Sequence, residues 1–386
     1  METKFENNYL TIELIDTVDS TNAEDVGKEI QELREKNPDG GLIIDAKKLK
    51  YISSAGLRQM LHLKKKEKDF KIINVSSEVY EVFEMTGFTE MIDIQKAYRE
   101  VSVEGCEKIG EGSNGIVYRL NPDTIIKVYK NNDALEDIKH ERELAKTALL
   151  LGINTAIPFD VVKVGDKFGS VFELLSAKSL TKIMAEEPEN VDKYIKVFVD
   201  LLKEIHTTEV KEGLLPDCKE RVLKWVNDLN GMLPEDKYNK LLRMVNEIPK
   251  SLNMLHGDYH SRNVHYANGE AIIIDMDTLS VGNPIFEFAN VFMAYQGFGE
   301  LDKTNVTDFL KMDWELATYV WNQTIKLYFA DKDEKFIEDL KHKAQVIGFT
   351  RLYRRTIRRE SDNKVLLEHC RKRLLDEIDL VDNLII

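Results

Sequence analysis

The sequence predicts two folded units, an α/β domain with a mixed sheet and helices over residues 1–102 and an α+β domain of two lobes over residues 103–386. In the first unit short apolar runs alternate with amphipathic helical patterns, which is typical of parallel strands joined by helices. From Glu107 a β-rich segment punctuated by glycines replaces this alternation, and the later patterns are mostly helical. The second unit should therefore have a β-rich lobe, residues 103–175, and a helical lobe, residues 176–386.

The elements of the first unit follow from runs of β-type residues and from apolar residues at helical spacing. A turn signal, Pro38-Asp39-Gly40, precedes the most apolar of the runs. The expected order is strand Tyr9–Ile15, helix Asn22–Lys36, strand Gly41–Asp45, helix Ala55–Lys66, strand Phe70–Val75, helix Glu78–Thr86 and strand Met91–Ile94.

The second unit begins with three glycines, Gly110, Gly112 and Gly115, in the spacing Gly-x-Gly-x-x-Gly. A dinucleotide-binding fold uses the same spacing but needs a helix directly afterwards, whereas the run that follows here is of β type. A loop between two strands instead lets backbone amides cover nucleotide phosphates, with the side chains of Ser113 and Asn114 as further donors. The alternative is a hairpin turn that needs glycine for positive φ.

Lys127 lies inside the apolar strand Thr124–Tyr129. An ammonium group buried without a partner is costly, so Lys127 should meet phosphate oxygens and a glutamate of the helix predicted over Asp133–Leu151. Glu141 shares a helix face with apolar residues, whereas Glu143 lies on a more polar row. We therefore expect Glu141 to be the partner. The alternative is a solvated lysine with an unrelated helix charge.

The helical lobe contains His256-Gly257-Asp258-Tyr259-His260-Ser261-Arg262-Asn263, followed by an apolar run that ends at Asp275. Phosphoryl transfer needs one carboxylate that orients a hydroxyl and oxygen ligands that hold magnesium on the nucleotide phosphates. Asp258 suits the first task, and Asn263 and Asp275 suit the second. The alternative is a polar turn between two strands.

The glycine loop, Lys127, the helix glutamate, the run from His256 to Asn263 and Asp275 occur in one order. Together they resemble the aminoglycoside-phosphotransferase and choline-kinase-like branch of the protein-kinase-like superfamily. The His-Gly-Asp opening and the second histidine mark this branch, and the resemblance extends from about Glu107 to the C-terminus.

The resemblance implies ATP and Mg²⁺ as cofactors, with Asp258 as the catalytic base. It also implies that backbone groups near Glu173 and Leu175 meet adenine at a hinge between the lobes. Two departures are visible: Ser261-Arg262 replaces the usual Pro-Gly, and Asn283 stands where Gly-Asp-Pro is common.

A row of arginines lies near the C-terminus at the spacing i, i+3, i+4, i+7 and i+8, which places all five on one helix face. They are Arg351, Arg354, Arg355, Arg358 and Arg359. Such a row can hold an anionic substrate or an acidic partner, or can be a solvated face paired with Glu360 and Asp362. Trp225, Trp314, Trp321 and Tyr353 are expected in the core rather than in a cage for choline.

The first unit carries Ser53-Ser54 directly before Ala-Gly-Leu, a good start for the following helix. This run and the β-α-β order resemble the STAS domain of anti-sigma-factor antagonists. The resemblance implies that a serine here is phosphorylated by a partner kinase; Ser54 is the first choice and Ser53 the second. Ile52 stands where that family often has an acidic residue.

Composition limits the function further. With 43% hydrophobic and 32% charged residues and a net charge of −14, the chain should be a soluble protein without general affinity for nucleic acids or membranes. Three cysteines far apart, and no secretory signal, indicate a reducing cytoplasm.

The leading interpretation is an ATP- and Mg²⁺-dependent kinase that phosphorylates a hydroxyl of a small molecule or of a serine. The alternative is a regulatory protein that binds a sigma-factor regulator through its first unit, while its kinase-like lobe senses nucleotide or phosphorylates Ser54.

Overall fold

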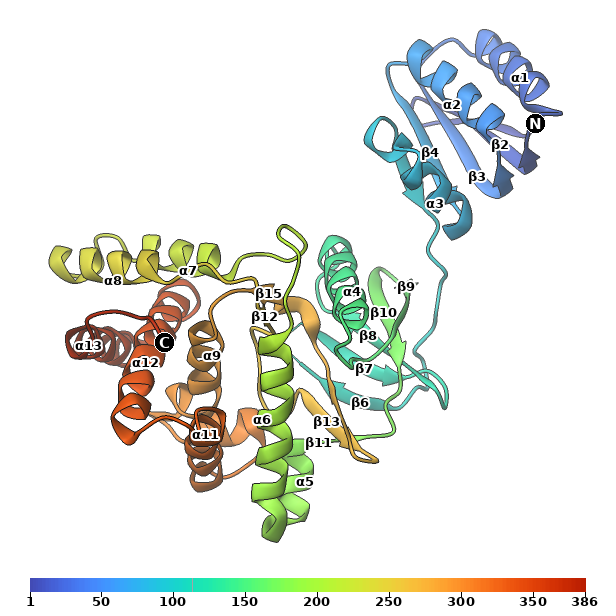
Figure 1. Cartoon of the computed structure of the whole chain (residues 1–386). Helices are drawn as coiled ribbons and strands as arrows, with labels where there is room; N and C mark the ends of the chain where they lie inside the picture. The colour runs from blue at the N-terminus through green and yellow to red at the C-terminus, as the bar shows by residue number, and fades with distance from the viewer. Residues whose placement is uncertain (113) are drawn as a thin grey trace. The chain divides into compact units, whose positions relative to one another are not determined.

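The computed structural model describes every residue of the chain except Ser113. The chain forms two compact units: Met1–Ser102 with Val161–Asp166, and Val103–Asp160 with Lys167–Ile386. Figure 1 traces the elements of each. No helix in the part of the chain described here has the length and apolar character needed to span a bilayer.

The first unit is a five-stranded mixed sheet in the order β1-β2-β3-β4-β5. The edge strand β1 is antiparallel to β2, and the remaining pairs are parallel. The strands are β1 Thr3–Glu6, β2 Tyr9–Val18, β3 Gly41–Ile52, β4 Phe70–Val75 and β5 Asp93–Lys96, and the helices are α1 Ala23–Lys36, α2 Ser54–Lys66 and α3 Ser77–Met85. Buried residues of α1, α2 and α3, including Ile30, Met60 and Phe83, share one core with the strands. The α/β class expected for this unit is confirmed.

Three details of the first unit differ from expectation. β1 was not predicted, because its four residues are all exposed and carry no apolar pattern. β3 continues seven residues beyond Asp45, since parallel pairing with β2 persists as far as Ile52 despite two register shifts. The last strand begins two residues late, because a 3-10 turn occupies Phe88–Glu90.

The β-rich lobe of the second unit is a five-stranded sheet in the order β6-β7-β8-β10-β9 with one long helix, α4. Its elements are β6 Lys108–Glu111, β7 Gly115–Arg119, β8 Thr124–Tyr129, α4 Leu135–Leu150, β9 Pro158–Val164 and β10 Lys167–Glu173. The run after the glycines is indeed a strand, since β7 pairs antiparallel with β6 and with β8. β8 lies between β7 and β10, so Lys127 projects from a strand that is paired on both sides.

The helical lobe contains nine α-helices in its described residues and two small sheets. The helices are α5 Leu180–Glu186, α6 Val191–Thr207, α7 Cys218–Asn227, α8 Glu235–Glu247, α9 Ile285–Tyr295, α10 Thr304–Leu310, α11 Trp314–Tyr328, α12 Glu334–Arg359 and α13 Lys364–Leu380. The strands are β11 Lys178–Ser179, β12 Met254–Leu255, β13 Val264–Ala267, β14 Glu270–Ile273 and β15 Ser280–Val281. α9 is buried along its whole length, and Figure 1 shows it among the other helices of the lobe.

The small sheets position the loops that carry the predicted site. The loop from β12 to β13 carries Asp258, and the loop from β14 to β15 carries Asp275. Because β12 pairs with β15 and β13 pairs with β14, each loop starts beside the end of the other. A backbone hydrogen bond of 2.9 Å from the Ile274 amide to the Asn263 carbonyl extends the second pairing. Asn263 and Asp275 are therefore neighbours in space.

Candidate active site

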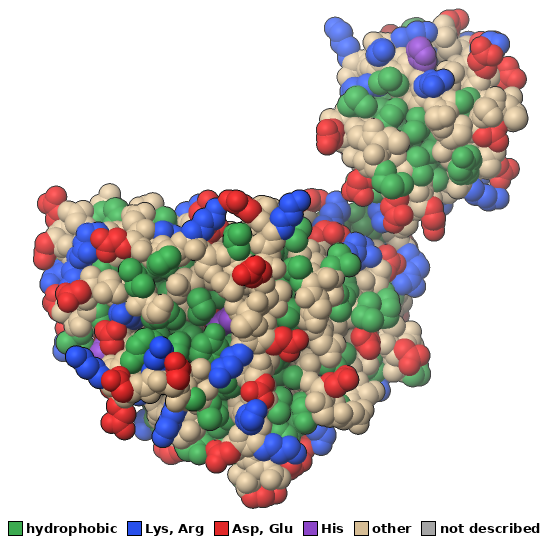
Figure 2. All heavy atoms as spheres, in the orientation of Figure 1, with side chains coloured by type: hydrophobic (Ala, Val, Ile, Leu, Met, Phe, Trp, Pro, Cys, Tyr) green, Lys and Arg blue, Asp and Glu red, His purple; other side chains and the backbone are tan. Residues whose placement is uncertain are grey.

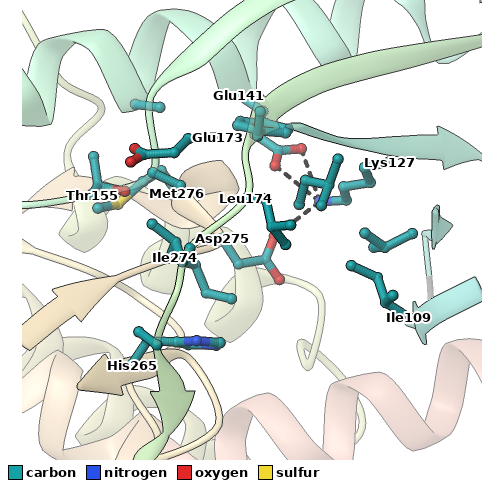
Figure 3. Close-up of a pocket in the computed structure, with 17 residues that line it drawn as sticks. Ile109, Lys127, Glu141, Thr155, Glu173, Leu174, His265, Ile274, Asp275 and Met276 are labelled. Atoms are coloured by element: carbon teal, nitrogen blue, oxygen red, sulfur yellow. Dashed lines mark hydrogen bonds and ion pairs between the residues drawn. The ribbon is translucent and has the colours of Figure 1, made fainter. Parts of the chain in front are cut away.

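Lys127 and the two carboxylates of Glu141 and Asp275 form the centre of the site. The Lys127 Nζ lies 2.9 and 3.1 Å from the two oxygens of Glu141 and 3.0 Å from Oδ1 of Asp275. Figure 3 shows the ammonium group facing both carboxylates, which come from a helix of one lobe and a loop of the other. This ion triad therefore joins the β-rich lobe to the helical lobe.

The burial of Glu141 follows from its place on α4. It is buried together with Ile138, Leu144, Ala145 and Ala148, whereas the side chain of Glu143 is 65% exposed. Burial alone would lower the pKa of Lys127, but the charges of Glu141 and Asp275 outweigh it and raise that pKa. Lys127 therefore stays protonated throughout the neutral range.

Tyr129 is a member of the site that the sequence did not indicate. Its hydroxyl donates a short hydrogen bond to Glu141, and its ring lies 5.2 Å from the Lys127 Nζ. Two residues apart on one strand, Lys127 and Tyr129 project on the same side of the sheet. The spacing of two residues was therefore the sequence signal that could have identified Tyr129. Its hydroxyl fixes the Glu141 carboxylate, which in turn bonds Lys127.

The loop that carries Asp258 is held by a buried carboxylate of α9. Both oxygens of Glu287 accept hydrogen bonds from the amides of His256 and Gly257, at 2.6, 3.0 and 3.1 Å. Burial raises the pKa of Glu287, but His206, the charge of His256 and the Gly257 amide outweigh it, and the pKa is lowered overall. Gly257 has φ +84°, and a Cβ there would lie 2.5 Å from the Thr278 carbonyl oxygen, so the loop requires glycine at this position.

Asp258 itself is half-buried and surrounded by basic groups. Its Oδ2 lies 3.5 Å from the His260 Nε2, and its side chain is 38% exposed. Burial raises the pKa of Asp258, but His260, Arg351 and His256 outweigh it and lower the pKa to about 2. Asp258 is therefore ionised at neutral pH, and its carboxylate is free to accept a hydrogen bond from a hydroxyl.

Asn263, Asp275 and a third residue, Asp277, are further polar residues near the loop that carries Asp258. The Asn263 Nδ2 donates to the Asp258 carbonyl at 3.1 Å, which fixes the side chain and leaves its amide oxygen available. Asp275 has φ +67° and ψ +66°, a left-handed conformation that is uncommon outside glycine. Asp277 also occupies this region: burial, together with the charges of Asp275 and Glu141, raises its pKa to about 7. The short spacing between Asp275 and Asp277 was the sequence signal that was missed.

Carboxylates and imidazoles alone do not make a metal cluster here: the described residues contain no group of three or more His, Cys, Asp or Glu side chains placed to hold a metal ion.

The glycine loop joins β6 and β7. Gly110 belongs to β6, the Gly112 amide donates to the Gly115 carbonyl at 2.9 Å, and Gly115 opens β7. Of these, Gly115 is required by space, since a Cβ there would lie 2.7 Å from the Val128 carbonyl oxygen. Ser113, the fourth predicted contact of this loop, lies outside the described residues. The Asn114 side chain approaches Asp277 at 3.5 Å.

An apolar cavity of about 340 Å³ lies beside the ion triad. Its lining includes Glu173 and Leu175, and Figure 3 shows Ile109 and His265 across the cavity from Glu141. The Glu173 amide already donates to the Ile157 carbonyl at 3.1 Å, whereas the Leu175 amide donates no hydrogen bond to another described residue. Of these two amides, only that of Leu175 is available to donate a hydrogen bond to a ligand.

The arginine row of α12 is divided among different partners. Arg354 and Arg358 face Asp228, and Arg355 pairs with Glu360. Arg351 instead turns inward, donates to the Asn290 side chain and stacks on Trp225. The solvated-face interpretation therefore fits part of the row but not Arg351. Asp362, which the sequence offered as a partner, makes no ion pair among the described residues, and Asp228 takes that place.

Trp321 and Tyr353 are core residues, as expected, and Trp225 and Trp314 are half-buried against the core. None of these four lies in the apolar cavity beside the ion triad.

Comparison with known proteins identifies the protein family of the chain. The model of the phosphotransferase enzyme family matches residues 105–318, and that of the STAS domain matches residues 1–101. Because the first match covers more than half of the chain, this protein belongs to the phosphotransferase enzyme family, and it carries a STAS domain at its N-terminus. The protein-kinase-like fold and the STAS domain expected from the sequence are confirmed.

Three of the solved structures similar to the chain are of aminoglycoside phosphotransferases. A thermostable mutant of APH(4)-Ia in its apo form has 11% identity and a TM-score of 0.49, covering 72% of this chain and 97% of that one. ADP-bound APH(2″)-Ib has 17% identity and a TM-score of 0.49, covering 79% and 99%. The streptomycin–ATP complex of APH(2″)-IIa has 16% identity and a TM-score of 0.47, covering 81% and 99%. Likeness at this level does not identify a substrate. No curated protein matches the chain.

Proposed function

We propose that the protein transfers the γ-phosphoryl group of ATP to a hydroxyl group with the help of Mg²⁺. The observation that carries this proposal is the ion triad, in which Lys127 bonds both Glu141 and Asp275 at 2.9–3.1 Å beside an apolar cavity. A lysine held in this way presents its ammonium group at the place where the phosphates of a nucleotide seated in the cavity would lie.

The residues present fit a magnesium ion. Asp275 and Asp277 offer carboxylates and Asn263 an amide, and oxygen donors of this kind are the ligands that magnesium prefers. In the described chain Lys127 is the one cation that forms an ion pair with Asp275, and Asp277 forms none, so negative charge is in excess there. We propose Asn263 and Asp275 as the ligands, with Asp277 beside them. When bound, the ion neutralises charge on the nucleotide phosphates.

Asp258 would orient the acceptor. Its ionised carboxylate accepts a hydrogen bond from the acceptor hydroxyl, whose oxygen attacks the γ-phosphorus while the bond to the bridging oxygen of ADP breaks. The hydroxyl proton passes to Asp258 and then to solvent. A carboxylate with a pKa of about 2 is a weak base, which suits a loose transition state in which positioning contributes more than early proton removal.

Slow hydrolysis of ATP tests this proposal without knowledge of the acceptor, because water can take the place of the hydroxyl. Asp258→Ala should lower the rate by about a hundredfold or more, while binding of a non-hydrolysable ATP analogue with Mg²⁺ stays within a few-fold. Asp275→Ala should lower the hydrolysis rate and also weaken binding of the ATP analogue. Asp331→Ala, an exposed aspartate with 77% side-chain exposure, is the matched control. Unchanged hydrolysis in Asp258→Ala would refute the assignment.

A second candidate function is regulatory and concerns the STAS domain. Ser53 is the N-cap of α2, and its Oγ accepts the Ala55 amide at 3.2 Å, whereas Ser54 is exposed in the first turn. Ser54 is thus the more accessible serine for a kinase, and phosphate there would sit at the positive end of α2. Mapping phosphoserine after incubation with labelled ATP, alone and with candidate sigma-regulatory partners, tests this role. Label that persists in Ser54→Ala would exclude it.

We propose a reducing, cytoplasmic location for the protein. All three cysteines, Cys106, Cys218 and Cys370, are free, and two of them are buried. Fractionation of the producing cells followed by immunoblotting tests the location.

A further inference from the structure

Two arginines from distant helices meet on one tryptophan beside the loop that carries Asp258. The guanidinium carbon of Arg221 in α7 lies 6.0 Å from the Trp225 ring centroid, and that of Arg351 in α12 lies 5.6 Å from the same centroid. All three side chains are half-buried and keep part of their surface in contact with solvent. Arg221 and Arg351 are called the arginine pair below.

Neither arginine of the pair has a carboxylate partner within ion-pair distance among the residues described by the structure. Arg221 bonds to the Thr278 carbonyl, the Ser280 hydroxyl and the Cys218 sulfur, and its Nε is buried without any hydrogen-bond partner. Arg351 bonds to the neutral side chain of Asn290. A partly desolvated guanidinium without a counter-ion is unfavourable, and arginine forks match carboxylate and phosphate groups.

The rest of the arginine row shows that acids are available nearby. Arg354 and Arg358 meet Asp228, and Arg355 meets Glu360. In Figure 2, lysines and arginines are likewise interspersed with acidic side chains over the face drawn. Arg359, the last of the row, also forms no ion pair among the described residues, but it is exposed, whereas Arg221 and Arg351 are half-buried. In a chain with a net charge of −14, two neighbouring half-buried arginines with no carboxylate at ion-pair distance form a local site of positive charge.

The arginine pair is connected to the catalytic loop on two sides. Arg221 bonds to the carbonyl of Thr278, and the Thr278 hydroxyl donates to the His256 carbonyl at 2.8 Å. Arg351 bonds to Asn290 of α9, the helix whose Glu287 accepts the His256 and Gly257 amides. Arg351 and Asp258 also lie within electrostatic reach of each other, since each shifts the pKa of the other.

We propose that the phosphate acceptor is a small hydroxyl compound that carries a carboxylate or phosphate group, and that Arg221 and Arg351 bind this anion while its hydroxyl faces Asp258. The inference rests on the proposed phosphotransferase function and names the chemical class of its substrate. The reaction is unchanged: the hydroxyl oxygen bonds to the γ-phosphorus, ADP leaves, and the proton passes to solvent through Asp258.

This proposal separates the protein from its structural neighbours. Kanamycin, gentamicin and streptomycin, which are bound in solved structures of such neighbours, are polycations, and two guanidinium groups would repel them. It also disfavours Ser54 as the acceptor, because the residues from Lys50 to Arg58 contain two basic side chains and no carboxylate.

Binding to the full-length protein saturated with Mg²⁺ and a non-hydrolysable ATP analogue tests the proposal, because the analogue keeps added anions out of the nucleotide site. The probes are matched in size and differ in charge: D-glycerate against glycerol, gluconate and glucose 6-phosphate against glucose, and kanamycin as the polycation. Calorimetry should detect binding of at least one anionic probe and of neither neutral counterpart. Gluconate and glucose 6-phosphate distinguish a carboxylate site from a phosphate site.

Arg351→Gln should lower the affinity for the anionic probe by about tenfold to a hundredfold, the effect of losing a hydrogen bond to a charged group. Arg221→Gln should do the same, and Arg354→Gln, the next arginine of the row, should bind the anion like the natural protein. Arg351→Lys keeps the charge and should recover part of the affinity. The thermal midpoint of each variant without ligand shows that it folds.

The proposal is overturned if no anionic probe binds, if kanamycin binds better than the anions, or if anion binding survives both glutamine variants. One further outcome would overturn it. If Arg351→Gln slowed ATP hydrolysis and phosphoryl transfer to the acceptor equally, and left anion binding intact, Arg351 would act only as a counter-ion for Asp258. Failure of the phosphotransferase assignment would appear separately, as absent binding of the ATP analogue and absent ATP hydrolysis in the natural protein.

Discussion

The buried carboxylate of Glu287 provides a sharp test of how the catalytic loop is held. Its two oxygens satisfy the amides of His256 and Gly257 through contacts of 2.6, 3.0 and 3.1 Å. Glu287→Gln keeps the shape but replaces one acceptor oxygen by an NH₂ group, which faces an N–H donor. With the glutamine oxygen in the Oε2 position both amides keep an acceptor, but the NH₂ group then lies about 3.0 Å from the Gly257 N–H, a donor against a donor in a buried site, which costs about 1–3 kcal/mol.

We therefore expect Glu287→Gln to lower the free energy of unfolding by about 2 kcal/mol. For a domain of this size that corresponds to a fall of about 4–8 °C in the midpoint of thermal unfolding. ATP hydrolysis should fall by about a hundredfold, because a displacement of about 1 Å at the reacting groups is enough for such a loss. Binding of the ATP analogue should change little, since Glu287 does not line the apolar cavity.

Urea unfolding, thermal unfolding and steady-state ATP hydrolysis measure these effects. Glu315→Gln, an exposed glutamate in the first turn of α11, is the control and should stay within about 0.5 kcal/mol of the natural protein. If Glu287→Gln unfolded at the same midpoint and hydrolysed ATP at the same rate, the two amides would not depend on this carboxylate, and the reasoning would fail.

Three further predictions concern single groups. Lys127→Met should lower kcat by about a hundredfold to a thousandfold, as loss of one preorganised donor does, while Lys196→Met, at an exposed lysine of α6, should not; equal rates in a steady-state assay would contradict this. Ser53→Ala should destabilise the first unit by about 1 kcal/mol through loss of its cap, and Ser54→Ala by no more than about 0.5 kcal/mol, as urea unfolding will show. Because the pKa of Asp258 is lowered, its ionised carboxylate stabilises the folded protein fully above the ordinary pKa of 3.8, and this stabilisation is lost as the pH falls through about 2. The difference in unfolding free energy between the natural protein and Asp258→Asn should therefore be constant from about pH 5 to 8 and shrink below about pH 4. If that difference grew in acid, the sign of the argument would be wrong.

Much of the fold was predictable because its signals are local. The boundaries of β4 and β8 were expected to the residue, since short apolar runs end at turn residues. Glu141 was selected over Glu143 because helical spacing places it among apolar side chains. β1 was not predictable, since its exposed residues are ordered only by pairing with β2.

The site was predictable in part. Asp258, Asn263 and Asp275 share one loop and one hairpin, so spacing along the chain indicated that they meet. Asp277 was missed although it lies two residues after Asp275, because its burial and its approach to the carboxylates of Asp275 and Glu141 arise only in the folded chain. Glu287 was missed because its hydrogen-bond partners lie on another element, and a glutamate in an apolar helix has no distinguishing local pattern.

By itself the sequence determined the two fold classes, the order of the glycine loop, Lys127 and the run from His256 to Asn263, and the pairing of Lys127 with Glu141, because periodicity, turn residues and motif spacing are properties of short segments. That Asp275 also bonds Lys127 was decided by the tertiary structure. Only the tertiary structure decided which carboxylate holds the catalytic loop and which arginine leaves the row on α12. Arg351 could not be distinguished from Arg354 or Arg355 by spacing, because its inward position depends on Trp225 and Asn290, which other helices supply. Contacts between charged side chains of different helices depend on how the helices pack, so the residue spacing within one segment does not predict them.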